Sequence, residues 1–200
     1  MLLNKKNIYL TDEKQPAGEQ PNFYENKFIG NFTIRRVLNE SDSKEQEMYY
    51  VTFKDGAMTK IHAHESEQIL IATNSSVDAQ QNITGRGFVV LIDKDYNTSK
   101  EDNNTDPQFI LSKTIFLDKI GDTVCIPPNV LHCHGSAQLG GLDFSHIAIR
   151  RSTLDNNQQA KTLWEYDTEA MKMVMGVRDD NKVSIILKEL HAEIRDAISK

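Results

Sequence analysis

The sequence predicts an all-β fold, a sandwich or a barrel, followed by a C-terminal α-helix. Short segments rich in β-branched and aromatic residues follow one another between residues 28 and 151, separated by Gly, Asn, Asp and Pro. Many short strands at this spacing are typical of antiparallel sandwiches and barrels. Strands do not alternate with helices in this region, as a doubly wound fold requires. Beyond residue 151 the pattern becomes helical.

The chain divides into three predicted parts. Its 200 residues correspond to one large domain or two small ones, enough to bury a core without disulfides. Residues 1–27 are polar and are interrupted by proline and glycine, so we expect an arm ahead of the first strand. We predict that residues 28–151 form the β domain and that residues 152–200 form a C-terminal extension.

Two segments differ from the strand pattern. Residues 93–108 show no apolar periodicity, which predicts a long hairpin loop between two strands. This loop is either a solvated insertion, which we favour, or a functional lid. Residues 182–199 are predicted to form an amphipathic helix that packs on the barrel or on a partner subunit. Its apolar residues recur at three- and four-residue steps: Val183, Ile186, Leu187, Leu190, Ile194 and Ile198.

The charge of the chain excludes several classes of partner. Twenty-three Lys and Arg residues against 29 Asp and Glu residues give a net charge of −6. A binder of nucleic acid or of an anionic membrane surface needs a basic face instead. We find no apolar run of membrane-spanning length and no signal-peptide core. We therefore expect a cytoplasmic protein with no nucleic-acid and no membrane partner.

Five of the six histidines lie in strand-like segments. His62 and His64 are separated by one residue, and His132 and His134 repeat this spacing. On a strand, residues i and i+2 point to the same face. His146 lies in a third such segment, and imidazole is a common ligand of transition metals. The pattern favours a metal site over histidines that are simply packed or hydrogen-bonded.

Two motifs around these histidines resemble those of the cupin superfamily. The first is Gly-x5-His-x-His-x3-Gln, from Gly56 to Gln68, and the second is Gly-x5-Pro-x-Asn-x2-His, from Gly121 to His132. The family pattern has glutamate at the position of Gln68 and glycine at that of Asn129. Asparagine tolerates a left-handed turn almost as well as glycine does.

The glutamine variant is similar to a cupin 2 subgroup, the carboxymuconolactone-decarboxylase-like cupins. The resemblance implies a small antiparallel β-barrel of the cupin, or jelly-roll, type. It also implies a homodimer. The shared segments in this chain are Gly85-Arg86-Gly87, Gly121-Asp122, Ile126-Pro127-Pro128, His132-Cys133-His134-Gly135 and Ser145-His146-Ile147-Ala148-Ile149.

The resemblance also implies a ligand set of His62, His64, Gln68 and His132 for one divalent transition metal. Mn, Fe, Ni, Zn and Co all fit such ligands, and the ligand set does not choose among them. Because these ligands are neutral, the site favours an anionic or chelating oxygen ligand in its open positions. Gln68 either ligates the metal or forms a hydrogen bond to a ligand.

His134 and His146 are expected to face the same cavity without coordinating the metal. Each is a candidate general acid or base, and the alternative is that both line the pocket or orient ligands. Cys133 is expected to point away from the cavity. Trp164 is expected to close one barrel end or support a dimer, and His191 to face solvent.

These residues predict a metal-binding cupin, most simply an enzyme that acts on a small carboxylate- or enol-bearing molecule. An isomerase, lyase or decarboxylase reaction is slightly favoured. One alternative is a metal-dependent dioxygenase with the same ligands. The other is a non-catalytic sensor or binding module for a small molecule.

Overall fold

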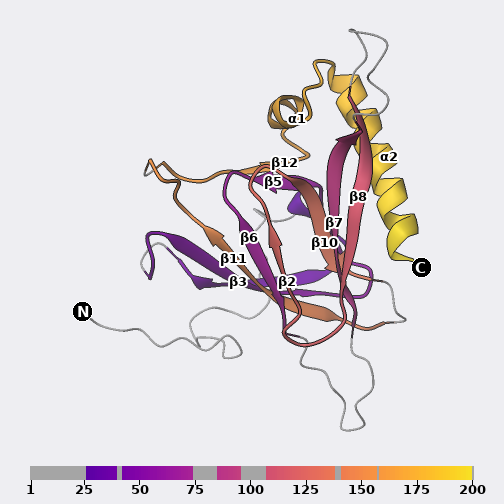
Figure 1. Cartoon of the computed structure of the whole chain (residues 1–200). Helices are drawn as coiled ribbons and strands as arrows, with labels where there is room; N and C mark the ends of the chain where they lie inside the picture. Colours follow the sequence, from indigo (N-terminus) through magenta and orange to yellow (C-terminus); the bar gives the residue numbers. More distant parts are fainter. Residues whose placement is uncertain are drawn as a thin grey trace.

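The computed structural model describes residues 26–39, 42–73, 85–95, 107–137, 141–156 and 158–199. Almost all of the predicted N-terminal arm lies outside these residues. Two antiparallel sheets form the described part of the molecule, and two helices follow them near the C-terminus (Figure 1). The predicted antiparallel all-β architecture with a C-terminal helix is confirmed.

The first sheet, sheet A, has the order β1-β4-β10-β5-β12, and β7 joins it by pairing with both β10 and β8. Its strands are β1 (Phe28–Ile29), β4 (Met58–Thr59), β5 (His62–His64), β7 (Gly87–Asp95), β8 (Gln108–Leu117), β10 (Leu131–Ser136) and β12 (Thr162–Trp164). Strand β12 belongs to the segment beyond residue 151, so the C-terminal extension contributes directly to this sheet.

The second sheet, sheet B, has the order β2-β3-β11-β6-β9. Its strands are β2 (Phe32–Leu38), β3 (Gln46–Phe53), β6 (Gln68–Ala72), β9 (Thr123–Ile126) and β11 (Phe144–Arg151). Phe53, Leu70 and Phe144 from this sheet meet Val89 and Leu117 of sheet A in one buried cluster. We call this cluster the sandwich core.

Helices α1 (Thr168–Met175) and α2 (Asp180–Ile198) cover the other face of sheet A, and α2 runs along β8 (Figure 1). Asp167 and Asp179 cap their N-termini by accepting backbone N–H bonds, which satisfies donors that have no partner within the helix. The apolar face of α2 is buried against the sheet, in agreement with the predicted amphipathic pattern. None of the described helices is both long and apolar enough to cross a membrane.

Strand β7 of sheet A is buried on both faces along most of its length, and its sequence reflects this. In β7, Phe88, Val90 and Ile92 contact the helices, whereas Val89 faces the sandwich core. Burial on both sides explains why this strand is an unbroken apolar run rather than an alternating one. Cys133 lies on the helix side, so the prediction that it points away from the cavity is confirmed.

Strands β7 and β8 form the predicted hairpin. Their pairing continues to Asp95 and Gln108, so both strands extend into the segment predicted as a loop. Residues 96–106 lie outside the described residues. The two alternatives for this segment, a solvated insertion and a functional lid, therefore stay predictions. The predicted domain boundaries stay predictions.

Candidate metal centre

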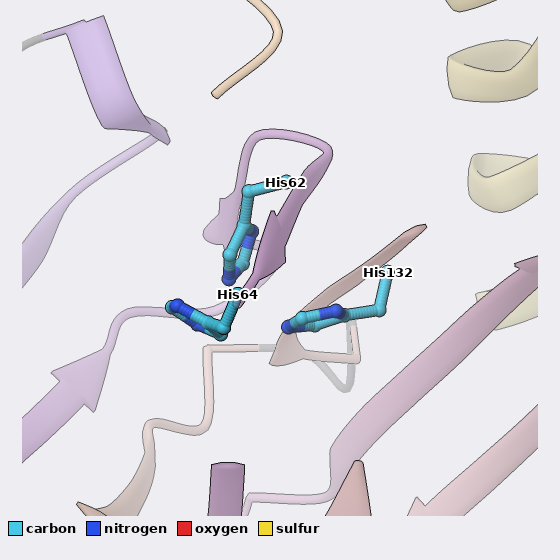
Figure 2. A group of neighbouring side chains, drawn as sticks. All are labelled: His62, His64 and His132. Carbon is cyan, nitrogen blue, oxygen red and sulfur yellow. The ribbon is translucent and has the colours of Figure 1, made fainter. Parts of the chain in front are cut away.

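Three histidines from two neighbouring strands of sheet A converge on one point. His62 and His64 lie on β5, and the register of β10 places His132 directly opposite His62. The ring centroids of His62 and His132 are 4.2 Å apart, and those of His62 and His64 are 4.9 Å apart. One nitrogen of each ring lies within 4.8 Å of the other two. Figure 2 shows the three side chains reaching into a shared space.

Two residues near the cluster meet special demands of the backbone: Asn129 in the turn before β10, and Gly135 within β10. Asn129 has φ 61°, and its N–H donates to the carbonyl oxygen of His64 at 2.7 Å. The expected left-handed turn at this residue is therefore confirmed. At Gly135 a β-carbon would lie 2.4 Å from the carbonyl oxygen of Ala57, so only glycine permits this approach of β10 to β4. The Asn129 bond ties the turn before His132 to the backbone of His64.

Hydrogen bonds at the far side of two rings determine which nitrogen is free. Nδ1 of His62 donates to the carbonyl oxygen of Lys60, and Nδ1 of His132 donates to that of Val130, each at 2.8 Å. Each Nε2 therefore carries a lone pair that points into the cluster. Nδ1 of His64 lies 2.9 Å from Thr162 Oγ1. Its Nε2 is buried and has no hydrogen-bond partner among the described residues.

Burial keeps the three imidazoles neutral. Loss of hydration lowers the pKa of His132 to about 4 and lowers the pKa of His62 and His64 well below the ordinary value. The neighbouring imidazoles and Arg150 lower the pKa of His64 further. A metal ligand must be unprotonated, so the cluster is in its binding form at neutral pH.

Gln68 approaches the cluster from sheet B. Its Oε1 lies 3.1 Å from Nε2 of His132. Because Nδ1 of His132 donates to a backbone carbonyl, its Nε2 is an acceptor, so Gln68 either donates to it through the amide N–H or shares a bound cation with it through Oε1. The three imidazoles could hold a divalent metal ion, whereas Gln68 as a fourth ligand stays a prediction.

The two predicted acid–base histidines occupy different positions. His134 lines the cavity, and its Nδ1 is buried without a partner among the described residues. His146 does not line the cavity and lies between the rings of Phe53 and Phe144, with centroid separations of 5.5 and 5.6 Å. Burial lowers the pKa of His146 to about 3. A catalytic role for either residue stays a prediction.

His62 and His64 line a cavity of about 550 Å³, together with Gln68. Trp164 lines this cavity and stacks on His62, with ring centroids 4.4 Å apart and an interplanar angle of 22°. Its pairing partner on β5 is His62 itself, so β12 places the indole over the metal centre.

An ion-pair network in sheet B forms another part of the cavity wall. The carboxylate of Glu47 lies 2.6 Å from Nη2 of Arg36 and 2.6 Å from Nη2 of Arg150. Tyr49 donates to the same carboxylate at 3.2 Å. Arg150 also donates to Thr162, which contacts His64.

Sequence reasoning did not identify this network. Arg150 lies four residues after His146 on β11, so period-two alternation could have placed the two residues on the same face. The neighbours of Arg150 could not have been found in this way. They depend on the register that puts it opposite both Gln68 and Glu47.

The expectation that His191 faces solvent is wrong. Its Nε2 lies 2.6 Å from Oε2 of Glu165, and its side chain is 13% exposed. The same carboxylate oxygen accepts the backbone N–H of Ile61 at 2.9 Å. Glu165 thus connects His191 of helix α2 to the backbone of Ile61, the residue next to His62.

No family model and no curated protein matches this sequence. Among solved structures, a cupin-like protein from Thermotoga maritima is 25% identical, covering 77% of this chain and 92% of that chain with a TM-score of 0.44. A cupin 2 conserved barrel domain protein from Rhodopseudomonas palustris is 11% identical, covering 80% and 81% with a TM-score of 0.43. A cupin superfamily protein from Desulfitobacterium hafniense is 10% identical, covering 74% and 98% with a TM-score of 0.40.

Proposed function

We propose that this chain is a metal-dependent enzyme of the cupin superfamily that acts on a small molecule bearing a carboxylate or an enol. The carrying observation is the convergence of His62, His64 and His132, each of which offers a ligand nitrogen within 4.8 Å of the other two. Three neutral imidazole nitrogens that converge in a buried space form the arrangement that a bound cation stabilises. The two cupin-like motifs support the same proposal.

A divalent ion bound here supplies a Lewis acid that polarises an oxygen of the substrate. The chain itself supplies groups for binding and for proton transfer. His134 has its ring centroid 5.5 Å from that of His62, and its free Nδ1 is placed to take up or return a proton. The reaction we propose is redox-neutral: an isomerisation, an elimination or a decarboxylation.

Metal binding can be tested through Trp164, the single tryptophan of the chain. The protein is purified without a metal-affinity column, stripped with EDTA and titrated with Co²⁺ while tryptophan fluorescence is recorded. We expect about one Co²⁺ per chain and strong quenching, because the indole stacks on a ligand. A His64→Ala/His132→Ala variant keeps His62 beneath Trp164 and should lose both signals. Equal Co²⁺ binding by this variant would contradict the proposed site.

The reaction class can be tested in D₂O with oxaloacetate and acetylacetone as probes. Proton transfer at an enolisable carbon incorporates deuterium, which NMR detects, and decarboxylation releases CO₂. The variant lacking His64 and His132 controls for catalysis by free metal. If the Fe²⁺-loaded protein consumes oxygen and incorporates no deuterium, the result would favour the dioxygenase alternative. Metal binding without any turnover would favour the sensor alternative.

We further propose that the protein belongs to the cupin 2 subgroup whose motif carries glutamine, acts in the cytoplasm and forms a homodimer. The motif around Gln68 supports the subgroup, and the family resemblance supports the dimer. Light scattering after size-exclusion chromatography tests the dimer directly. A mass near the 22.8 kDa of a single chain at micromolar concentration would contradict it.

A further inference from the structure

Two of the three clustered histidines are oriented by their own strands, and the third is not. In His62 and His132, Nδ1 donates to the backbone carbonyl of the residue two positions earlier. These bonds are local and involve no other side chain. His64 differs, because the hydrogen-bond contacts of its Nδ1 among the described residues are with the side chains of Thr162 and Arg150. The orientation of this one imidazole therefore depends on residues far away in the sequence.

The register of sheet A brings Thr162 to His64. Strand β12 pairs with β5 so that Thr162 lies opposite His64, 98 positions earlier in the sequence, and Trp164 lies opposite His62. Residues i and i+2 of a strand share a face, so both side chains of β12 point to the same side of the sheet. Each contacts the imidazole opposite it: Trp164 stacks on His62, and Thr162 Oγ1 lies 2.9 Å from Nδ1 of His64.

The hydroxyl of Thr162 is itself held in place from sheet B. Nη1 of Arg150 donates to Oγ1 of Thr162, while Nε of Arg150 donates to Oε2 of Glu47 at 2.8 Å. Glu47 is buried, which fixes the far end of this connection. The two heavy atoms on Cβ of a threonine also restrict rotation of its side chain. The oxygen atom beside His64 therefore has a defined position.

A metal ion on Nε2 of His64 requires the proton of this neutral imidazole to be on Nδ1. His64 is buried, so this N–H needs an acceptor within the protein. Arg150 carries only donors and cannot accept the proton. Oγ1 of Thr162 has two lone pairs, of which one receives the bond from Arg150 and the other is available to His64. Among the described contacts of Nδ1, Thr162 is thus the acceptor that the metal-bound form needs.

We propose that Thr162 is a positioning residue of the metal centre: its hydroxyl oxygen accepts the Nδ1–H of His64 and holds Nε2 toward the other two imidazoles. Thr162 acts through His64 and does not touch the ion itself. The inference rests on the metal site proposed above. It makes β12, which follows the predicted β domain in the sequence, a part of that site.

Three variants test the proposal by titration calorimetry with Co²⁺, and urea unfolding shows that each is folded. Thr162→Val keeps the shape of the side chain without the acceptor and should weaken Co²⁺ binding at least about tenfold. Thr162→Ser returns the hydroxyl and should recover most of the affinity. Thr33→Val makes the same change at an exposed position of β2 and should leave the affinity unchanged. Equal affinity in Thr162→Val and Thr33→Val overturns the proposal, and so does equal weakening in Thr162→Val and Thr162→Ser.

A second measurement needs no metal. Protein labelled with ¹⁵N-histidine is studied by NMR in EDTA, and a His64→Ala variant identifies the ring resonances of His64. In Thr162→Val these resonances should shift, whereas those of His62 and His132, whose Nδ1 atoms bond to the backbone, should change much less. Unshifted His64 resonances overturn the proposal even when Co²⁺ still binds. If they shift but the wild-type protein binds no Co²⁺, the contact of Thr162 with His64 stands and the proposed function fails.

Discussion

The two His-x-His pairs of this protein have the same spacing but different surroundings. Both rings of the β5 pair, His62 and His64, belong to the three-histidine cluster that could hold a metal ion. In the β10 pair, His132 belongs to it, whereas the ring of His134 lies 5.1 Å from that of His146. Identical spacing therefore places both members of a pair on one face but does not give them one role.

The difference follows from strand register. Residues i and i+2 on a strand are separated by almost 7 Å along its axis. The residue that lies opposite the first of them on the neighbouring strand therefore does not lie opposite the second. His132 lies opposite His62, but His134 has moved toward Thr59, whose hydroxyl accepts its backbone N–H at 3.0 Å. The next four predictions test whether His132 binds the metal while His134 does not, and which neighbouring residues support each of them.

The largest difference is expected between alanine variants of the two members of the β10 pair. His132→Ala removes a ligand and should weaken Co²⁺ binding at least about 100-fold, or about 2.7 kcal/mol. His134→Ala should change the affinity by less than about threefold, because His134 lies outside the cluster. Titration calorimetry measures both, and urea unfolding shows whether each variant folds. A similar loss in both variants would remove the distinction between the two residues.

The second prediction concerns His146, the partner of His134. Its folded-state pKa of about 3 lies below the ordinary value of 6.5, so the unfolded chain binds the extra proton between these values. Stability from this residue is complete above about pH 6.5 and is lost as pH falls toward 3. At pH 5 the loss is on the order of 2 kcal/mol.

His146→Leu should remove this part of the acid sensitivity. Urea unfolding at pH 7 and pH 5 in EDTA provides the measurement. The free energy of unfolding should fall less in the variant than in the wild type, by on the order of 2 kcal/mol. Identical pH dependence in the two proteins would show that His146 is not a buried neutral imidazole.

The third prediction concerns Gln68, which faces His132. If its Oε1 shares a cation with His132, Gln68→Ala should weaken Co²⁺ binding about tenfold, or about 1.4 kcal/mol, and Gln68→Glu should strengthen it. Gln159→Glu adds the same charge at the cavity lining and serves as the matched control. If the Gln68 amide instead donates its Nε2–H to His132 and does not contact the metal, Gln68→Glu and Gln159→Glu should have the same Co²⁺ affinity.

The smallest effect is expected at Glu165, which joins α2 to the β5 pair. Its carboxylate accepts from Ile61, next to His62, and bonds to His191. Glu165→Gln should lower the free energy of unfolding by about 1 kcal/mol and weaken Co²⁺ binding about threefold. Glu189→Gln, on the exposed face of α2, is the control. Unchanged Co²⁺ affinity would mean that α2 does not position His62.

Local patterns in the sequence determined a large part of this structure. Period-two alternation placed His62, His64 and His132 on one face and Cys133 on the other, and three- and four-residue steps defined the buried face of α2. The left-handed turn at Asn129 was also predictable from the residue type. Each of these properties depends on neighbours within a few positions, which the order of residues specifies directly.

Only the tertiary structure decided which of these side chains meet. It placed Arg150 between Gln68 and Glu47, stacked Trp164 on His62 and buried His191 against Glu165. These contacts join residues far apart in the sequence, and they depend on cross-strand register and on helix packing. A one-residue change of register would turn every side chain of a strand to the opposite face, so the choice is made by burial of the whole sheet rather than by any local pattern.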